Sequence, residues 1–192
     1  FGQESTIACG VACAIMAVFK INKLKPGSKA VYYEKQIVDL AAKLFGPNPL
    51  GAAGLNNQQM LRLLNHADLK MGGWKFGTLP PGSVPQKIID VVGVTSRIGP
   101  TVDAKPMILG VDWKGGGGHW VVVDTVREFM GKKYATVCDP WDANVHMVPI
   151  EPKKTFAYTG QKVQGFDFWG KRHEYAAPSE GGVFLGDVIW RE

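Results

Sequence analysis

The sequence is poor in the residues that cross-link small proteins. It has only three cysteines in 192 residues, and no two of them form a CxxC pair. An odd number of cysteines, two of them within one expected helix, favours neither a disulfide framework nor a zinc site. We therefore expect the protein to work in a reducing compartment, without a metal ion or a cofactor.

Long apolar runs and an excess of acidic residues are also missing. No apolar run approaches the roughly 20 residues that cross a bilayer, so we expect no membrane segment. The formal net charge is +5, which favours an acidic protein partner. The basic residues are scattered through expected loops, which argues against nucleic-acid binding. Examples are Lys23, Lys25, Lys132, Lys133, Lys153 and Lys154.

Length and composition indicate one globular domain, 1–192, with 45% hydrophobic and 20% charged residues. The chain begins with Phe1 rather than methionine, so we expect it to be a piece of a longer protein. Helical patterns fill about 1–93 and strand patterns about 106–192. This segregation predicts an α+β fold, with a helical part packed on an antiparallel sheet.

Apolar periodicity and turn signals place the individual elements. Helices are expected at 11–19, 31–45, 56–71 and 84–92. Strands of one antiparallel sheet are expected at 107–113, 119–126, 134–138, 145–150 and 183–190. The interval 151–182 has no clear period, so we expect a long excursion from the sheet, with room for its own hairpin.

Cys9 begins the first helical run, six residues after Gln3. Unpaired N–H groups at a helix start favour the reactive thiolate form of a cysteine. The Gln3 amide and the Cys9 backbone N–H can together hold an oxyanion, and Gly10 allows another chain to approach closely. The alternative is that Cys9 and Cys13, four residues apart on one helical face, simply pack in a core.

His119 has the setting of a general base. It follows four glycines and begins an apolar strand, so its imidazole can face a cleft. Asp139 lies at the end of the next strand, where its carboxylate can accept the imidazole N–H. The alternatives are an exposed histidine after a flexible loop and an ordinary turn aspartate before Pro140. His66, His146 and His173 have no comparable setting.

In this order, these residues resemble the papain-like cysteine peptidases, especially the double-glycine leader peptidases of bacteriocin exporters. The matching blocks are Gln3, Cys9, Gly10, Ala12, Cys13 and Met16, then Gly118, His119, Val121 and Val122, then Asp139 and Pro140. The resemblance implies a papain-like fold and a peptidase that cleaves a protein substrate through a thioester. It also implies that Cys9 is the nucleophile, His119 the base and acid, and Asp139 the orienting carboxylate.

The resemblance further implies that Gln3 is the oxyanion-hole donor. Double-glycine peptidases have a narrow cleft that rejects side chains, so the resemblance implies cleavage after small residues or two glycines. It also implies that Gly118, Trp120 and Trp141 contact substrate, and both tryptophans are open to a plain packing role. The chain departs from the exporter peptidases in its longer cysteine-to-histidine interval, in the long segment after Asp139, and in lacking a visible transporter. Similar domains occur as toxin modules of secreted bacterial effectors, which an immunity protein neutralises.

We therefore expect a delivered bacterial effector that acts in the cytoplasm of a target cell, with an acidic immunity partner. Four alternatives stay open from the sequence. The same triad serves deamidases or transglutaminases and peptidoglycan amidases, because all form an acyl-enzyme. Leader processing for an exporter and an inactive peptide-binding relative are the other two.

Overall fold

The computed structural model describes residues 2–22, 33–95, 105–114, 116–159 and 181–192. The helices are α1 (Cys9–Ile21), α2 (Glu34–Phe45), α3 (Asn57–Leu64) and α4 (Val84–Val92), with 3-10 turns η1 (Ala67–Leu69) and η2 (Pro81–Ser83). The strands are β1 (Trp74–Thr78), β2 (Val94–Thr95), β3 (Met107–Trp113), β4 (Gly118–Phe129), β5 (Lys132–Asp139), β6 (Asn144–Pro149), β7 (Ala157–Tyr158) and β8 (Gly182–Arg191).

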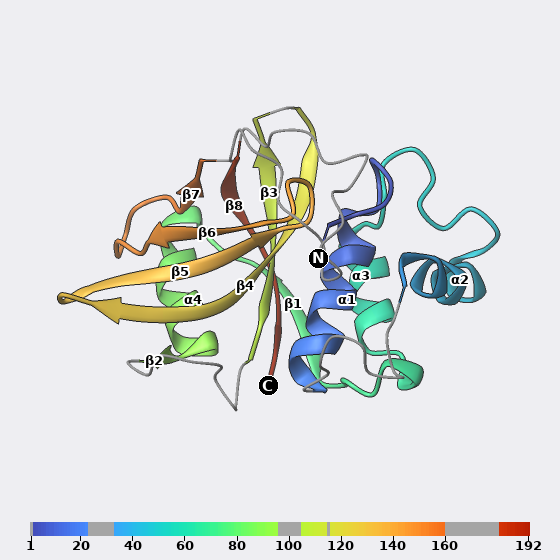
Figure 1. Cartoon of the computed structure of the whole chain (residues 1–192), viewed down its shortest axis with the longest axis horizontal. Coiled ribbons are helices and arrows are strands. Elements are labelled where there is room, and N and C mark those ends of the chain that lie inside the picture. Colours follow the sequence, from blue (N-terminus) through green and yellow to red (C-terminus); the bar gives the residue numbers. More distant parts are fainter. Residues whose placement is uncertain (1, 23–32, 96–104, 115, 160–180) are drawn as a thin grey trace.

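The strands form one curved sheet in the order β1-β8-β3-β4-β5-β6 (Figure 1). β7 pairs with β8 at the side of this path, and β2 pairs with β4. All pairs among the predicted strands are antiparallel, as expected. The one parallel pair in the described structure joins β4 to β2, a two-residue strand that was not predicted. The mixed helix and sheet composition confirms the predicted α+β class.

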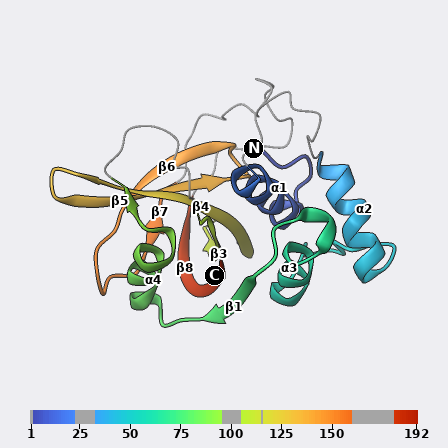
Figure 2. The same ribbon diagram turned by 90° about the horizontal axis from the view of Figure 1, so that it is seen from below.

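Helices cover the sheet on both faces, as Figures 1 and 2 show. α1, α2 and α3 lie together on one side, where their apolar residues form a core with Trp120, Val122 and other sheet residues. α4 lies on the other side and packs on Val121, Val123 and their neighbours. The alternation of β4 side chains between these cores explains its continuous apolar sequence, because both faces are buried.

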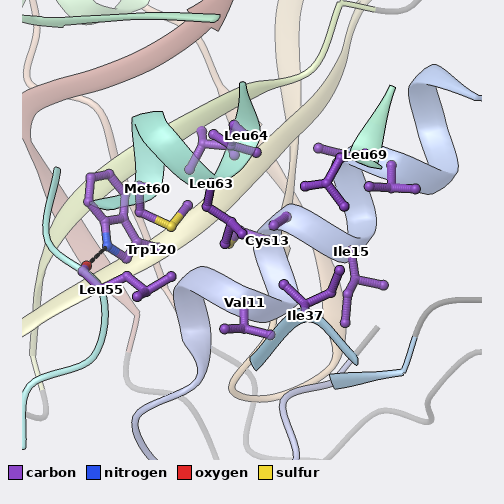
Figure 3. Close-up of a cluster of buried hydrophobic side chains, with 14 of the residues drawn as sticks. Val11, Cys13, Ile15, Ile37, Leu55, Met60, Leu63, Leu64, Leu69 and Trp120 are labelled. Atoms are coloured by element: carbon purple, nitrogen blue, oxygen red, sulfur yellow. Dashed lines mark hydrogen bonds between the residues drawn. The ribbon is translucent and has the colours of Figure 1, made fainter. Parts of the chain in front are cut away.

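α1 runs through the first core and is almost entirely buried. Figure 3 shows its Val11, Cys13 and Ile15 among Ile37 of α2 and leucines that precede and follow α3. At its C-terminal end, Lys20 Nζ forms an ion pair with Asp124 Oδ2 of β4 at 2.7 Å. Packing along α1 and this ion pair at its end fix the helix relative to β4.

Most predicted elements are found, with shifts of a few residues at their ends. The expected helix 56–71 is the main error, because α3 ends at Leu64 and η1 follows. Asn65 stops the helix: its side chain accepts from Trp74 N–H and donates to Trp74 O, so it binds β1 instead of the next turn. β1 itself lies inside the predicted helical part and was not predicted.

The long interval 151–182 contains β7, and 160–180 of it lies outside the described residues. Within the described ranges, no helix is long and apolar enough to cross a membrane.

Candidate active site

Cys9 is the first residue of α1. The N-cap residue is Ala8, which has no side chain that could cap the helix, and the first turn contains no acidic residue. The N-cap side chain therefore accepts no hydrogen bond from the first backbone N–H groups of α1. At α3, by contrast, the Asn56 side chain accepts one from Gln59 N–H. Such an uncapped helix start favours a negative charge beside it.

Close packing places this end of α1 against β4. A Cβ added to Gly10 would lie 2.7 Å from Met60 Sδ and 3.4 Å from Trp120 Cδ1. The groups close to Gly10 are side chains of this same protein, from α3 and β4, so the approach of another chain at Gly10 stays a prediction. Trp120 is held there by a 2.9 Å hydrogen bond from its indole N–H to Leu55 O, drawn in Figure 3.

His119 connects the thiol to a carboxylate. Its Nε2 lies 2.7 Å from Asp139 Oδ1, and its ring also has a hydrogen bond with the Cys9 thiol. Because Nε2 faces Asp139, Nδ1 is the ring nitrogen left for Cys9. The structure thus brings the three predicted catalytic residues into one continuous chain of hydrogen bonds.

The electrostatics of this chain favour a charged histidine. Burial lowers the pKa of His119, but its hydrogen bonds to Asp139 and Cys9 and their negative charge outweigh burial and raise the pKa to about 10. Burial raises the pKa of Asp139, yet hydrogen bonds from His119, Tyr158 and the Trp141 N–H lower it to about 2. Imidazolium and carboxylate are therefore both present at neutral pH.

Tyr158 of β7 is a part of the site that the sequence analysis missed. Its hydroxyl donates to Asp139 Oδ2 at 2.6 Å, while Trp141 N–H donates to Oδ1 at 2.8 Å. Together with His119, these donors fix the carboxylate in one orientation. The strand is two residues long and follows an aperiodic stretch, so the sequence carried no signal that Tyr158 returns to Asp139.

Gln3 is buried beside the strand end that carries Asp139. Its backbone N–H donates to Pro140 O at 2.8 Å, and its side-chain Nε2 donates to Ser5 O at 2.7 Å. Its Oε1 is buried without a hydrogen-bond partner in the described structure. The Ser5 contact uses one of the two N–H groups of Nε2, which leaves the second for an oxyanion, so the predicted role stays a prediction.

A cavity of about 290 Å³ opens beside the thiol, and we call it the Cys9 cleft. Its walls come from loop 53–57 and from β3, β4 and β8, and its lining includes Cys9, His119, Gly118 and Trp120. A Cβ at Gly118 would meet no atom within 4 Å, so this glycine leaves open space next to His119. The structure therefore places Gly118 and Trp120 where the sequence analysis expects substrate contacts.

Trp141 is placed elsewhere. It does not line the Cys9 cleft, and its ring packs on Trp113 with centroids 4.5 Å apart. Trp113 in turn packs on the His119 ring at 5.6 Å. These two indoles shield the histidine, so the arrangement favours the packing role that the sequence left open for Trp141.

The sequence predicts no metal site, whereas the described residues include one group whose possible ligand atoms lie close together. Asp139, Asp142 and His146 are buried, and one ligand atom of each lies within 4.8 Å of the others. Asp139 already accepts hydrogen bonds from His119, Tyr158 and Trp141, so a metal ion would have to displace these donors. The donor set therefore fits a histidine-orienting carboxylate better than a metal ligand.

No protein-family model and no curated protein matches this chain. The chemical assignment therefore depends on the geometry described above. That geometry is a thiol at a helix start, an imidazole bonded to it, and a carboxylate behind the imidazole, all at the wall of a cleft.

Proposed function

We propose that this protein is a cysteine peptidase of the papain-like type, with Cys9 as nucleophile, His119 as base and acid, and Asp139 as orienting group. The observation that carries the proposal is the hydrogen-bonded chain from Cys9 through His119 to Asp139 at the edge of the Cys9 cleft. A buried structural histidine needs no thiol partner at a cleft wall, whereas nucleophilic catalysis needs all three groups in this order.

The charged His119 supports nucleophilic attack. An imidazolium and a helix start beside Cys9 Sγ both stabilise a thiolate, which is the attacking species. Sγ attacks the carbonyl carbon of the substrate, and the Cys9 backbone N–H with the Gln3 amide holds the oxyanion. The C–N bond then breaks, and His119 gives its proton to the leaving amine.

Hydrolysis of the thioester completes the cycle. His119 is now neutral and accepts a proton from water, whose oxygen attacks the thioester carbonyl. The C–S bond breaks, the carboxylic acid product leaves, and the thiolate and imidazolium pair returns. Asp139 accepts the N–H at Nε2 of the neutral imidazole. Nδ1, which faces the thiol, is therefore free to accept a proton.

Intact-mass spectrometry of a treated protein substrate tests this proposal. Peptidase activity yields two fragments whose masses sum to that of the substrate plus one water, and Cys9→Ala abolishes them. A Cys138→Ala control removes a different cysteine and keeps the activity. A small mass gain without fragments would instead indicate deamidation, and unchanged cleavage by Cys9→Ala would refute the assignment of Cys9.

The effector role expected from the sequence remains a proposal of its own. If this domain is a toxin, its production in a bacterial cytoplasm stops growth, and Cys9→Ala removes that effect. Equal growth with the active and Cys9→Ala proteins would contradict the toxin role without affecting the peptidase assignment.

A further inference from the structure

The Cys9 cleft has a charge opposite to that of the whole chain. Apart from Cys9 and His119, its ionisable lining residues are Asp112 of β3 and Asp187 of β8. Among the described residues that line the cleft there is no lysine or arginine, although the protein carries a net charge of +5. The His119 imidazolium is paired with the Asp139 carboxylate behind it, so the two aspartates leave the cleft with an excess of negative charge, which attracts cationic ligands.

Asp187 is fixed in position by two neutral hydrogen-bond donors. Thr78 Oγ1 donates to its Oδ1 at 2.7 Å, and Asn57 Nδ2 donates to its Oδ2 at 2.8 Å. Both donors are neutral, so they orient the carboxylate without neutralising it. In the described structure, neither Asp187 nor Asp112 has an ion-pair partner. A carboxylate that is already oriented loses little conformational freedom when it binds a cation.

Strand geometry makes room for this carboxylate beside the reacting groups. Gly110 pairs with Trp120, and a Cβ at position 110 would lie 3.1 Å from Asp187 Cβ and 3.4 Å from the Trp120 ring. Asp112 pairs with Gly118, next to His119, and is exposed. The two carboxylates therefore lie along the same cleft as the thiol.

The remaining walls are apolar. Leu55 and Trp120 line the cleft, and so does Leu185, whose side chain is 55% exposed. An apolar wall with a carboxylate beyond it matches a side chain that has a methylene stem and a cationic end, as in lysine and arginine.

We propose that the Cys9 cleft binds a lysine or arginine side chain of a polypeptide substrate close to the scissile bond. This inference rests on the proposed peptidase function, because it concerns a substrate. The charge preference of the cleft itself does not depend on catalysis. Asp187 and Asp112 bind the cationic group, while Leu185 and Trp120 contact the methylene stem.

The first test maps cleavage sites in an unfolded protein and compares matched peptides. Lysine or arginine is expected at one fixed position relative to the cleaved bond. The matched peptides carry lysine or its uncharged analogue norleucine at this position. The Asp112→Asn/Asp187→Asn double variant should lower kcat/KM for the lysine peptide about tenfold and leave kcat/KM for the norleucine peptide almost unchanged. Asp90→Asn, an exposed charge on α4, is the control. Absence of basic residues at the sites, or an equal loss for both peptides, would overturn the inference.

The second test needs no turnover. Cys9 is modified with cationic and anionic methanethiosulfonate reagents, and the ratio of the two rates is measured. The double variant should lower the cation-to-anion ratio about fivefold or more, whereas Asp90→Asn leaves it unchanged and thermal unfolding checks the fold. An unchanged ratio in the double variant overturns the charge preference. A lowered ratio in a protein that cleaves nothing supports the preference and refutes only the peptidase function.

Discussion

At the scale of single residues, the three cysteines have different environments. Burial raises the pKa of Cys13 well above its ordinary value and raises that of Cys138 to about 12. Cys9 instead lies at the Cys9 cleft with a hydrogen bond to His119. The packing role that the sequence left open for Cys9 thus fits Cys13, which is fully buried one turn further along α1.

Tyr158→Phe tests whether the hydroxyl on Asp139 Oδ2 positions the triad. The variant keeps the ring that packs against His146 and Phe184, and removes only the hydrogen bond. We expect kcat for a cleaved peptide to fall about tenfold while KM changes little, because the carboxylate loses one of the donors that orient it.

Tyr134→Phe is the matched control for this prediction. Tyr134 lies on β5, and Tyr134→Phe likewise removes one phenolic hydroxyl. Unlike the Tyr158 hydroxyl, this one does not bond Asp139. It should leave kcat unchanged. Equal kcat values in wild type and Tyr158→Phe would show that Tyr158 only packs.

The three proposed catalytic residues could be predicted from the sequence, whereas residues that folding alone brings to the site could not. Cys9 and His119 belong to scarce residue types, and with Asp139 they lie at the ends of clear elements. Tyr158, Asp112 and Asp187 are ordinary strand residues, and only the pairing of β3 and β8 and the return of β7 give them their place. Their roles need three-dimensional contacts that no local spacing encodes.

At the scale of elements, a bend in β8 brings Asp187 to the Cys9 cleft. Gly186 has φ +115°, and a Cβ there would lie 1.9 Å from Leu79 O. The same glycine accepts a hydrogen bond from Leu79 N–H through its carbonyl oxygen at 2.9 Å. The bend therefore requires glycine both for its backbone angle and for this close approach.

Gly186→Ala should lower the free energy of unfolding by about 3 kcal/mol or more, because the new methyl group clashes with backbone. Gly46→Ala is the control, since Gly46 has φ +104° but open space around its Cβ position. The control should cost about 1 to 2 kcal/mol, because it has backbone strain without a clash. Chemical denaturation measures both, and equal losses would contradict the proposed clash.

The elements themselves were largely predictable because apolar periods are local. The errors have tertiary causes: Asn65 ends α3 by bonding β1, and β1 exists because it pairs with β8 at the edge of the sheet. In the Trp74–Thr78 segment only Trp74, Lys75 and Phe76 alternate between apolar and polar, and this strand signal is too short to stand out after a helical pattern.

At the scale of the whole molecule, buried ionisable groups link stability to pH. Glu34 of α2 is 5% exposed and accepts a 2.5 Å hydrogen bond from Glu4 N–H, in the segment that leads from Gln3 to Cys9. Burial raises its pKa to about 7, against the opposing effect of the hydrogen bonds from Glu4 and Ser5. The folded protein therefore binds a proton at Glu34 more tightly than the unfolded chain does.

It follows that stability should fall as pH rises from about 4.5 to about 7, the ordinary and folded pKa values of Glu34. We expect a loss of about 1 to 3 kcal/mol over this interval. Glu34→Gln should flatten this part of the profile, measured by denaturation at several pH values. Glu151→Gln, at an exposed loop position, is the control. An unchanged slope in Glu34→Gln would contradict the assignment.

His119 should act in the next pH interval. Its folded pKa of about 10 exceeds the ordinary 6.5, so its contribution to stability is complete below 6.5 and is lost as pH rises towards 10. In the proposed mechanism the imidazolium that this shift preserves at neutral pH also stabilises the Cys9 thiolate. The account therefore predicts that stability and reactivity depend on the same proton.

The rate of Cys9 alkylation by iodoacetamide at pH 6, with and without His119, is the most direct measurement of the central claim. Peptide mapping by mass spectrometry identifies which cysteine reacts. The account predicts that Cys9 is modified before Cys13 and Cys138, and that His119→Gln slows its modification at least tenfold. Equal rates in the two proteins, or first modification of Cys13 or Cys138, would contradict a Cys9–His119 nucleophilic pair.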